Sequence, residues 1–322
     1  MIRRRIPDDV LSAAHARAKA REARDWAEAD RLRAEIEAAG WKVVDRGTDF
    51  ALSPAAPADI AESDRIRYGS SQSVPSRLDD APSGVATVVV IATDWPADLV
   101  RALAGLASTS PDGTSVVIVA DGPSIEQETA LLAMAGEAPS RIPTELIWTS
   151  ERLGYAAATN IGLRRAAGPI AMLLDTSVEP TGDIVTPLVR ALDDLSVAVA
   201  GGWGIVSGDL RTFEDAPPGD VDAIEGYCQA FRRTDFVDRG PLDERFRFYR
   251  NLDIWWSLVL RDGGEGRAHR RAVRLDGIPA LRHEHRGYAS LPEAERDRQS
   301  KRNFYRILDR FRDREDLLTH RT

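Results

Sequence analysis

After Gly84 the sequence alternates between short, continuous apolar stretches and longer helical segments, and this alternation restricts the fold more than any other feature. The stretches of strand length are Ala86–Ala92, Ser115–Ala120, Glu145–Trp148 and Ile170–Leu174. The segments predicted as helices between them are Ala97–Ser108, Ser124–Gly136 and Ala156–Ala167. Strands that are apolar throughout and separated by helices predict a parallel sheet covered on both faces. We therefore expect an α/β fold with a Rossmann-like, mainly parallel mixed sheet flanked by helices.

Aspartates follow three of these strands, at Asp94, Asp121 and Asp175. In such sheets ligands bind at the carboxyl ends of the strands. A single aspartate at a strand end is most often a turn or cap residue. Three at one edge of a sheet favour a site for a polar ligand or a cation.

The same segments resemble family 2 glycosyltransferases. Residues 87–93 and 116–124 look like the first two strands of that family, and residues 151–168 are similar to its G-x-x-x-A-x-N-x-G-x-x-x-A-x-G stretch. Asp175-Thr176-Ser177 resembles the D-x-D strand end, and residues 226–233 and 240–249 resemble the acceptor-side motifs. The resemblance extends from about Gly84 to Leu318 and implies a glycosyltransferase-A type fold.

The resemblance implies that the chain binds a nucleotide diphosphate sugar and transfers its sugar to an acceptor hydroxyl. The residues that it assigns to the nucleotide are Thr93, Asp94, Asp121, Arg152, Gly154, Asn160, Asp175 and Thr176. Asp121 would accept a hydrogen bond from the nucleobase. Asp175 would bind Mg²⁺ or Mn²⁺, whose charge stabilises the leaving diphosphate. Neither the donor nor the acceptor can be identified from the sequence.

The remaining metal ligands depart from the family pattern. Ser177 stands where the second aspartate of D-x-D is expected, and a serine brings no charge. The resemblance implies that a histidine near the C-terminus completes the site, which points to His283 or His285 without choosing between them. The alternative is that both histidines are ordinary surface residues.

The catalytic base is implied by position and by chemistry. The family's Glu-Asp pair is replaced by Arg250-Asn251, and the carboxylate that remains is Asp253. A base must be a carboxylate within reach of the acceptor hydroxyl, so Asp253 is the first candidate, with Asp243 or Glu244 in reserve. Alternatively, Asp253 only caps a helix over Leu252–Arg261. The chain would then be a catalytically impaired nucleotide-sugar binding module.

Aromatic residues gather around this segment and in the C-terminal helix. Phe248, Tyr249, Trp255 and Trp256 suit either the core or a platform for an acceptor sugar, and the core is the commoner use. Residues 292–318 predict a charged helix with an apolar stripe that packs on the main domain. The stripe consists of Phe304, Tyr305, Leu308 and Phe311.

The N-terminal residues form a separate region. Residues 7–39 predict two helices with a break near Ala23–Asp25, and Trp41–Leu52 predicts a hairpin turning at residues 45–48. The second helix has a stripe at helical spacing made of Trp26, Ala29, Leu32, Arg33 and Ile36. We expect a helical hairpin appendage over residues 1–53, a linker over 54–83 that is partly ordered around Ile60–Tyr68, and a transferase domain over 84–322.

This region also resembles the C-terminal tail of cysteinyl-tRNA synthetases over about fifty residues. The resemblance implies an association with RNA, and an RNA-associated adaptor is a third hypothesis for the chain. However, acidic and basic residues nearly balance in this segment. We therefore expect it to serve packing or formation of a homodimer.

Composition excludes several other classes. The net charge of −8 argues against a general nucleic-acid binder. No apolar stretch approaches the ~20 residues of a membrane-spanning helix, so no span is expected. With a single cysteine, Cys228, no internal disulfide can form, and a reducing cytoplasm suits the chain best.

Overall fold

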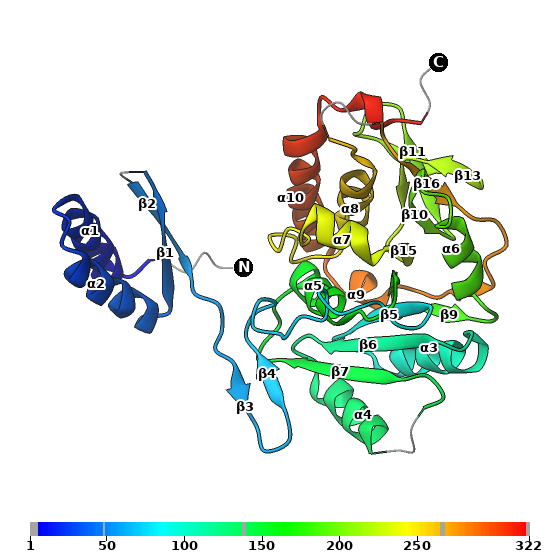
Figure 1. Cartoon of the computed structure of the whole chain (residues 1–322), viewed down its shortest axis with the longest axis horizontal. Helices are drawn as coiled ribbons and strands as arrows, with labels where there is room; N and C mark the ends of the chain where they lie inside the picture. The colour runs from blue at the N-terminus through cyan, green and yellow to red at the C-terminus, as the bar shows by residue number, and fades with distance from the viewer. Residues whose placement is uncertain (1–5, 48, 137–139, 265–267, 320–322) are drawn as a thin grey trace. The chain divides into compact units, whose positions relative to one another are not determined.

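The computed structural model describes residues 6–47, 49–136, 140–264 and 268–319. The chain divides into two compact units, Met1–Ala58 and Asp59–Thr322. In Figure 1 the first unit is blue, and the second runs from light blue through green and yellow to red. Each unit has its own core and is described by itself. No helix within the described ranges is both long enough and apolar enough to cross a bilayer.

The N-terminal unit is a helical hairpin followed by a β-hairpin, as the sequence predicts. Its elements are α1 (Asp8–Glu22), α2 (Trp26–Ala38), β1 (Trp41–Arg46) and β2 (Asp49–Pro54). The chain breaks between the helices at Arg24, whose φ is +59°. Asp25 then caps α2 by accepting the N–H of Glu28. The predicted hairpin turn includes residue 48, which lies outside the described residues.

The apolar stripe of α2 is narrower than expected. Ala29, Leu32 and Ile36 are buried against α1 and the hairpin, whereas Trp26 is 58% exposed. Trp26 is the first residue of its helix and extends beyond the core. Arg33 lies on the exposed face, where it pairs with Glu37. The prediction that Trp26 and Arg33 belong to the stripe is therefore wrong.

The large unit is built on a mainly parallel mixed sheet, which confirms the predicted fold class. Strands β5 (Ala86–Ala92), β6 (Thr114–Ala120), β7 (Thr144–Thr149) and β8 (Ile170–Leu174) are parallel. Among the described residues the strand order is β13-β16-β10-β15-β8-β5-β6-β7-β4-β3. β15 (Cys228–Arg232) runs antiparallel between β8 and β10 (Val197–Gly201), which makes the sheet mixed.

The other elements surround this sheet. The helices are α3 (Pro96–Thr109), α4 (Ile125–Ala135), α5 (Tyr155–Arg165), α6 (Val185–Ala191), α7 (Arg233–Arg239), α8 (Leu252–Arg261), α9 (Arg286–Ala289), α10 (Glu293–Phe311) and a 3₁₀ turn (Glu315–Leu317). The remaining strands are β3 (Ile60–Ala61), β4 (Ile66–Tyr68), β9 (Val178–Pro180), β11 (Gly204–Ser207), β12 (Phe213–Asp215), β13 (Gly219–Val221), β14 (Ala223–Ile224), β16 (Arg271–Arg274) and β17 (Ala280–Arg282).

Helices cover both faces of the sheet because the strand side chains alternate between two cores. Val88 and Val90 of β5 lie in one apolar cluster with residues of α3, α4 and α6. Val89 between them lies in the other cluster, with α5 and α8. Successive side chains of a strand point to opposite faces, so an entirely apolar strand supplies both cores.

The linker expected over residues 54–83 differs from the structure. The division between the units falls after Ala58, and β3 and β4 extend the large sheet. β4 pairs in parallel with β7, through Arg67 opposite Trp148 and Tyr68 opposite Thr149. Ser, Ala, Pro and Asp dominate the segment, and its two strands are only two and three residues long.

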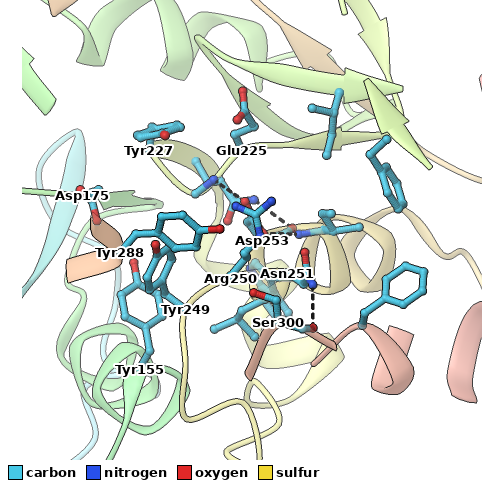
Figure 2. Close-up of a pocket in the computed structure, with 18 of the residues that line it drawn as sticks. Tyr155, Asp175, Glu225, Tyr227, Tyr249, Arg250, Asn251, Asp253, Tyr288 and Ser300 are labelled. Carbon is cyan, nitrogen blue, oxygen red and sulfur yellow. Dashed lines mark hydrogen bonds between the residues drawn. The ribbon is translucent and has the colours of Figure 1, made fainter. Parts of the chain in front are cut away.

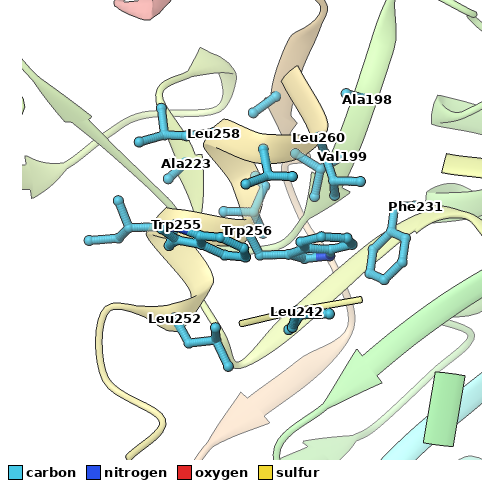
Figure 3. Packing of buried hydrophobic residues seen from close by; sticks show 14 of the residues in the cluster. Ala198, Val199, Ala223, Phe231, Leu242, Leu252, Trp255, Trp256, Leu258 and Leu260 are labelled. Carbon is cyan, nitrogen blue, oxygen red and sulfur yellow. The ribbon is translucent and has the colours of Figure 1, made fainter. Parts of the chain in front are cut away.

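The second core contains the tryptophan pair of α8 (Figure 3). Trp256 is 1% exposed and meets Phe231 edge-on, with ring centroids 5.6 Å apart. Trp255 is also buried, which confirms the core interpretation of the pair. On α10 the buried residues are Asn303, Ile307 and Phe311, whereas Tyr305 is 53% exposed. The predicted stripe is correct at Phe311 and wrong at Tyr305, because the buried face follows every fourth residue from Asn303.

Candidate functional site

A cavity of about 700 Å³ opens at the carboxyl end of β8 (Figure 2). Its acidic lining residues include Asp175, Glu225 and Asp253, and His285 also lines it. Four tyrosines line it as well, namely Tyr155, Tyr227, Tyr249 and Tyr288. A volume of this size is typical of small-molecule sites, which combine apolar walls with a few convergent polar groups.

Asp175 is held at the end of β8 by a set of hydrogen bonds. Its N–H donates to Tyr227 O over 3.0 Å. Its Oδ1 accepts the Ser177 N–H at 2.8 Å and the Ser177 hydroxyl at 2.5 Å, and His285 Nε2 lies 3.1 Å from Oδ2. Burial tends to raise the pKa of Asp175, but the contacts with His285 and Ser177 outweigh it and hold that pKa below its usual value. Ser177 therefore orients the carboxylate instead of adding a second charge.

The structure separates the two candidate histidines. β17 pairs with β9, which places His283 Nε2 2.7 Å from Glu179 Oε2. His285 begins α9 and stacks on Tyr249, with ring centroids 4.2 Å apart. Its Nδ1 accepts the N–H of Tyr288 at 3.1 Å, so its proton is on Nε2, facing Asp175. Of the two histidines, His285 is the one next to Asp175.

The pair Asp175 and His285 has donors suited to a divalent cation. No group of three or more acidic, histidine or cysteine side chains with metal-site geometry occurs in the described ranges. Carboxylate and imidazole are both ligands that Mn²⁺ accepts, and Mg²⁺ commonly takes one or two carboxylates plus substrate phosphates. The pair therefore fits a cation whose coordination is completed by a diphosphate. Binding through His285 Nε2 would require its proton to move to Nδ1, which would end the hydrogen bond that Nδ1 accepts from Tyr288.

Asp253 lines the cavity from the first turn of α8. Its Oδ2 accepts the Gly226 N–H at 2.8 Å, and its Oδ1 accepts the Ile254 N–H at 3.0 Å. Burial raises its pKa, and these hydrogen bonds only partly offset that effect. The residue preceding the helix, Asn251, has a φ of +69° and donates through Nδ2 to Ser300 O. The backbone thus fixes the Asp253 carboxylate inside the cavity.

The two reserve candidates for the base do not line the cavity. Asp243 pairs with Arg245, whose Nη2 lies 2.6 Å from Asp243 Oδ2. Glu244 accepts hydrogen bonds from the hydroxyl of Ser71 and from Asn160. Both carboxylates therefore serve the structure of this segment.

Asn160, which the resemblance assigns to the nucleotide, makes its side-chain hydrogen bonds to other parts of the protein. It is buried, and its side-chain amide donates to Leu242 O at 2.9 Å and to Glu244 Oε1 at 3.1 Å. Its Oδ1 accepts the Leu242 N–H at 2.8 Å. These bonds fasten the segment that follows α7 to α5. An amide engaged in this way has no donor left for a nucleotide.

The other predicted nucleotide residues meet at the ends of β5, β6 and β7, outside the lining of the cavity. Buried Asp121 accepts the N–H groups of Leu153 at 2.7 Å and Gly154 at 3.1 Å. Burial is the main cause of its raised pKa. Arg152 lies 3.1 Å from Asp94 and donates to Gly122 O. Asp121 thus holds the backbone loop that carries Arg152.

Glycine is required where these loops meet. Gly122 has a φ of +52°, and a Cβ there would lie 2.4 Å from Arg152 N. Gly154, with a φ of +105°, starts α5. Thr93 accepts the N–H of Ser124 through its carbonyl, and Thr176 lies partly exposed between Asp175 and Ser177. The structure therefore places Thr93, Gly154 and Thr176 at the carboxyl edge of the sheet, as the pattern predicts.

Glu225 and Asp215 are acidic residues of the cavity that the sequence analysis did not single out, and the charge of Asp253 acts on Glu225. Glu225 lies between β14 and β15, with Arg282 Nη1 3.7 Å from its Oε2. Burial raises its pKa, and the negative charge of Asp253 adds to the rise. No periodicity or motif marks it, because it precedes a short antiparallel strand and enters the cavity only through the pairing of β15 with β8.

Comparison with known proteins identifies the family and the fold. Residues 87–250, about half of the chain, match the model of the family described as glycosyl transferase family 2. A structure of GalNAc-T7 with UDP, GalNAc and Mn²⁺ superposes with a TM-score of 0.57 and 15% identity, over 74% of this chain and 50% of that one. The mannosyltransferase PcManGT of Pyrobaculum calidifontis, in complex with GDP-Man and Mn²⁺, gives a TM-score of 0.55 and 18% identity, over 76% of this chain and 71% of that one.

These similarities show a glycosyltransferase-A type fold, and the chain spans only half the length of the GalNAc-T7 chain. A shorter match concerns a cysteine–tRNA ligase of Opitutus terrae, 46% identical over 50 residues, which are 16% of this chain and 11% of that protein. It supports the resemblance to these synthetases over that length only.

Proposed function

The chain belongs to glycosyl transferase family 2, and from this premise we propose that it moves a sugar from a nucleotide diphosphate sugar to an acceptor hydroxyl, with inversion. The observation that carries the proposal is the single cavity lined by Asp175 and by the carboxylates of Asp253 and Glu225. An inverting transfer needs a group that holds the leaving diphosphate and a base that takes the acceptor's proton. In this proposal Asp175 serves the diphosphate and Asp253 or Glu225 serves as the base, and all three line the same cavity.

The donor nucleoside is proposed to bind at the ends of β5 and β6. Arg152 and Asp94 are partly exposed there and adjacent to each other. Thr93 lies at the same edge, at the end of β5. Asp121 acts by shaping the 153–154 loop, since both of its oxygens already accept backbone N–H groups. Oδ1 also accepts the Thr149 hydroxyl at 3.3 Å, so Oδ2 is the oxygen that retains a lone pair for contact with a nucleobase.

Asp175 and His285 would hold the divalent cation, Mg²⁺ or Mn²⁺. The two solved structures of similar fold contain Mn²⁺ together with UDP or GDP-Man. A bound cation supplies positive charge to the diphosphate as it leaves. Ser177 fixes Asp175 Oδ1 through two hydrogen bonds, which leaves Oδ2 to face the cation.

Asp253 is proposed as the base. Its two oxygens are oriented by one backbone N–H each, so each still has a lone pair for the acceptor hydroxyl. Its raised pKa makes it a stronger base than an exposed aspartate. Glu225 is the alternative base, because its carboxylate lines the same cavity and its Oε2 lies 3.7 Å from Arg282 Nη1, beyond hydrogen-bond distance.

The competing function is a binding module without transfer, which Arg250 and Asn251 in place of the family's acidic pair favour. Thermal unfolding of the full chain with UDP-, GDP- and dTDP-sugars, with and without Mn²⁺, tests both. Stabilisation by one donor only when Mn²⁺ is present, followed by slow hydrolysis of that donor, supports the enzyme. Stabilisation without turnover in any acceptor mixture supports the module, and no stabilisation by any donor contradicts both.

A further inference from the structure

Three basic side chains line the cavity without a partner of their own. Arg211 follows β11, Arg250 precedes α8, and Lys301 lies on α10. Within the described ranges, no carboxylate lies within ion-pair distance of any of the three, and none makes a side-chain hydrogen bond. Arginines elsewhere in the large unit are commonly paired, for example Arg232, Arg270 and Arg271.

The acidic side chains of the same cavity do not form ion pairs with these cations. Asp175 Oδ2 lies 3.1 Å from His285 Nε2, and Glu225 faces Arg282. Asp253 is satisfied by two backbone N–H groups. Asp215 is the one lining carboxylate that remains without a close partner in the described part of the chain. None of the three cations therefore forms an ion pair with a carboxylate of the lining in the described part of the chain.

Uncharged hydrogen-bond donors without partners lie in the same lining. Trp256 is only 1% exposed, and its buried Nε1–H has no hydrogen-bond partner among the described residues. The hydroxyl of Ser300 is likewise buried and unpaired. Buried donors are usually satisfied, so each of these groups indicates a missing partner. An oxyanion offers several acceptors and no donor, which is what this set requires.

Arg250 is placed by aromatic contacts instead of by an acid. Its guanidinium lies 5.2 Å from the centre of the Tyr288 ring, and that of Arg296 lies 4.7 Å from the same centre. Figure 2 shows Arg250, Asn251, Asp253 and Ser300 gathered on one side of the cavity, with Asp175 on the other. A guanidinium held over a ring keeps its fork of N–H donors free for a carboxylate or phosphate.

We propose that Arg211, Arg250, Ser300 and Lys301 bind an oxyanion group of the acceptor, so that the acceptor is an acidic molecule bearing a carboxylate or a phosphate. The inference rests on the proposed function, because it assigns the acceptor of that same cavity. Arg250 precedes Asp253 by three residues, so an anion bound there brings the rest of the acceptor beside the proposed base. The charge that replaces the family's acidic pair then selects the substrate.

Calorimetric titration of the full chain at constant ionic strength tests this inference. The probes are glucose, glucuronate and glucose 6-phosphate, which share a sugar ring and differ in the anionic group. The variants are Arg250→Gln with Lys301→Gln, and Arg211→Gln alone. The matched control is Arg190→Gln, an exposed arginine on α6 outside the cavity, which makes the same change in charge.

We expect one or both anionic sugars to bind while glucose does not. Affinity should fall about 10- to 100-fold in the double variant and remain unchanged in the control. Whichever of glucuronate and glucose 6-phosphate binds identifies the group as carboxylate or phosphate. Equal binding of glucose, or anion binding that the double variant leaves intact, would overturn the inference.

Donor binding, measured separately with UDP- and GDP-sugars and Mn²⁺, distinguishes failure of this inference from failure of the proposed function. Donor binding without an anion site contradicts only the inference. An anion site that depends on Arg250 and Lys301, without donor binding, contradicts only the proposed transfer. Circular dichroism and thermal unfolding of each variant confirm that a loss of affinity does not reflect unfolding.

Discussion

His285 Nε2 lies 3.1 Å from Asp175 Oδ2, although the two residues are far apart in the sequence. The contact exists because β17 pairs with β9 directly after the Asp175 turn, and α9 then returns the chain to the cavity. It places the Nε2–H of His285 next to the Asp175 carboxylate, which is proposed to hold the cation. The neighbouring His283 is directed to Glu179 instead.

The two histidines should therefore behave differently on substitution. We expect His285→Ala to weaken Mn²⁺-dependent donor binding about 10- to 100-fold, because it removes a ligand and the stacking partner of Tyr249. His283→Ala, the matched control, should leave that binding unchanged. The measurement is donor titration with and without Mn²⁺. Equal losses in the two variants would contradict the assignment.

Ser177→Ala should destabilise the chain, because it removes a hydrogen bond to the Asp175 carboxylate. The serine is 3% exposed, and its hydroxyl donates to a buried carboxylate. We expect a loss of about 1–3 kcal/mol in the free energy of unfolding. Urea denaturation measures this loss, with Thr176→Ala as the control because no side-chain hydrogen bond of Thr176 occurs in the described structure. A hydroxyl without this role would give similar values for both variants.

The acid limb of the transfer rate should lie at higher pH than an ordinary carboxylate gives. Burial raises the pKa of both Asp253 and Glu225. As the pH is lowered, the base therefore becomes protonated and activity is lost before the pH reaches about 4, the ordinary pKa of a carboxyl. Asp253→Asn should lower kcat about 100-fold or more, and Glu225→Gln should have a smaller effect. Rates of donor hydrolysis or transfer against pH check this. The opposite ranking would make Glu225 the base.

These raised pKa values also set the direction of pH-dependent stability. A carboxyl whose pKa is higher in the folded chain than in the unfolded chain stabilises the fold when protonated, and this contribution is lost as pH rises through the folded pKa. Asp253→Asn removes that dependence. The variant should therefore lose less stability than the parent chain between pH 4 and neutrality, as denaturant titrations at several pH values would show.

Asn160→Ala should act on folding and not on nucleotide affinity. It leaves the N–H and carbonyl of Leu242 buried without partners, at an expected cost of about 2–4 kcal/mol. Nucleotide affinity, measured below the unfolding temperature, should stay within about twofold. Weakened nucleotide binding in a variant of normal stability would restore the contact that the family resemblance implies.

Removal of residues 1–58 tests the proposed role of the N-terminal unit. This unit has its own core, and Arg17 pairs with Asp45 at 2.7 Å inside it. We expect the remaining chain to keep its unfolding temperature, because the large unit has separate cores. If the appendage forms a homodimer, light scattering should show a dimer for the full chain and a monomer for the truncated one. A monomer in both cases would exclude dimer formation through this unit.

The sequence by itself determined the four adjacent parallel strands β8, β5, β6 and β7 of the sheet and the carboxyl edge at which ligands bind in such sheets. β5, β8 and α8 begin and end at the predicted residues, because their apolar character is continuous over each element. Asp121 and Asp175 follow such strands, so their position depends on local pattern alone. The burial of Trp255 and Trp256 is also predictable from the sequence, because large aromatic residues most often lie in the core.

The partners of each polar side chain were decided only by the tertiary structure. Asn160, Glu244 and Asp243 fit the expected types of residue, but contacts with Leu242, Ser71 and Arg245 take them away from the cavity. The choice of His285 over His283 depends on the register of β17 on β9. In this register His283 contacts Glu179, whereas His285, two residues later, contacts Asp175. Glu225 enters the cavity through an antiparallel strand that no local pattern marks. Hydrogen-bond partners distant in sequence are set by packing, which periodicity cannot describe.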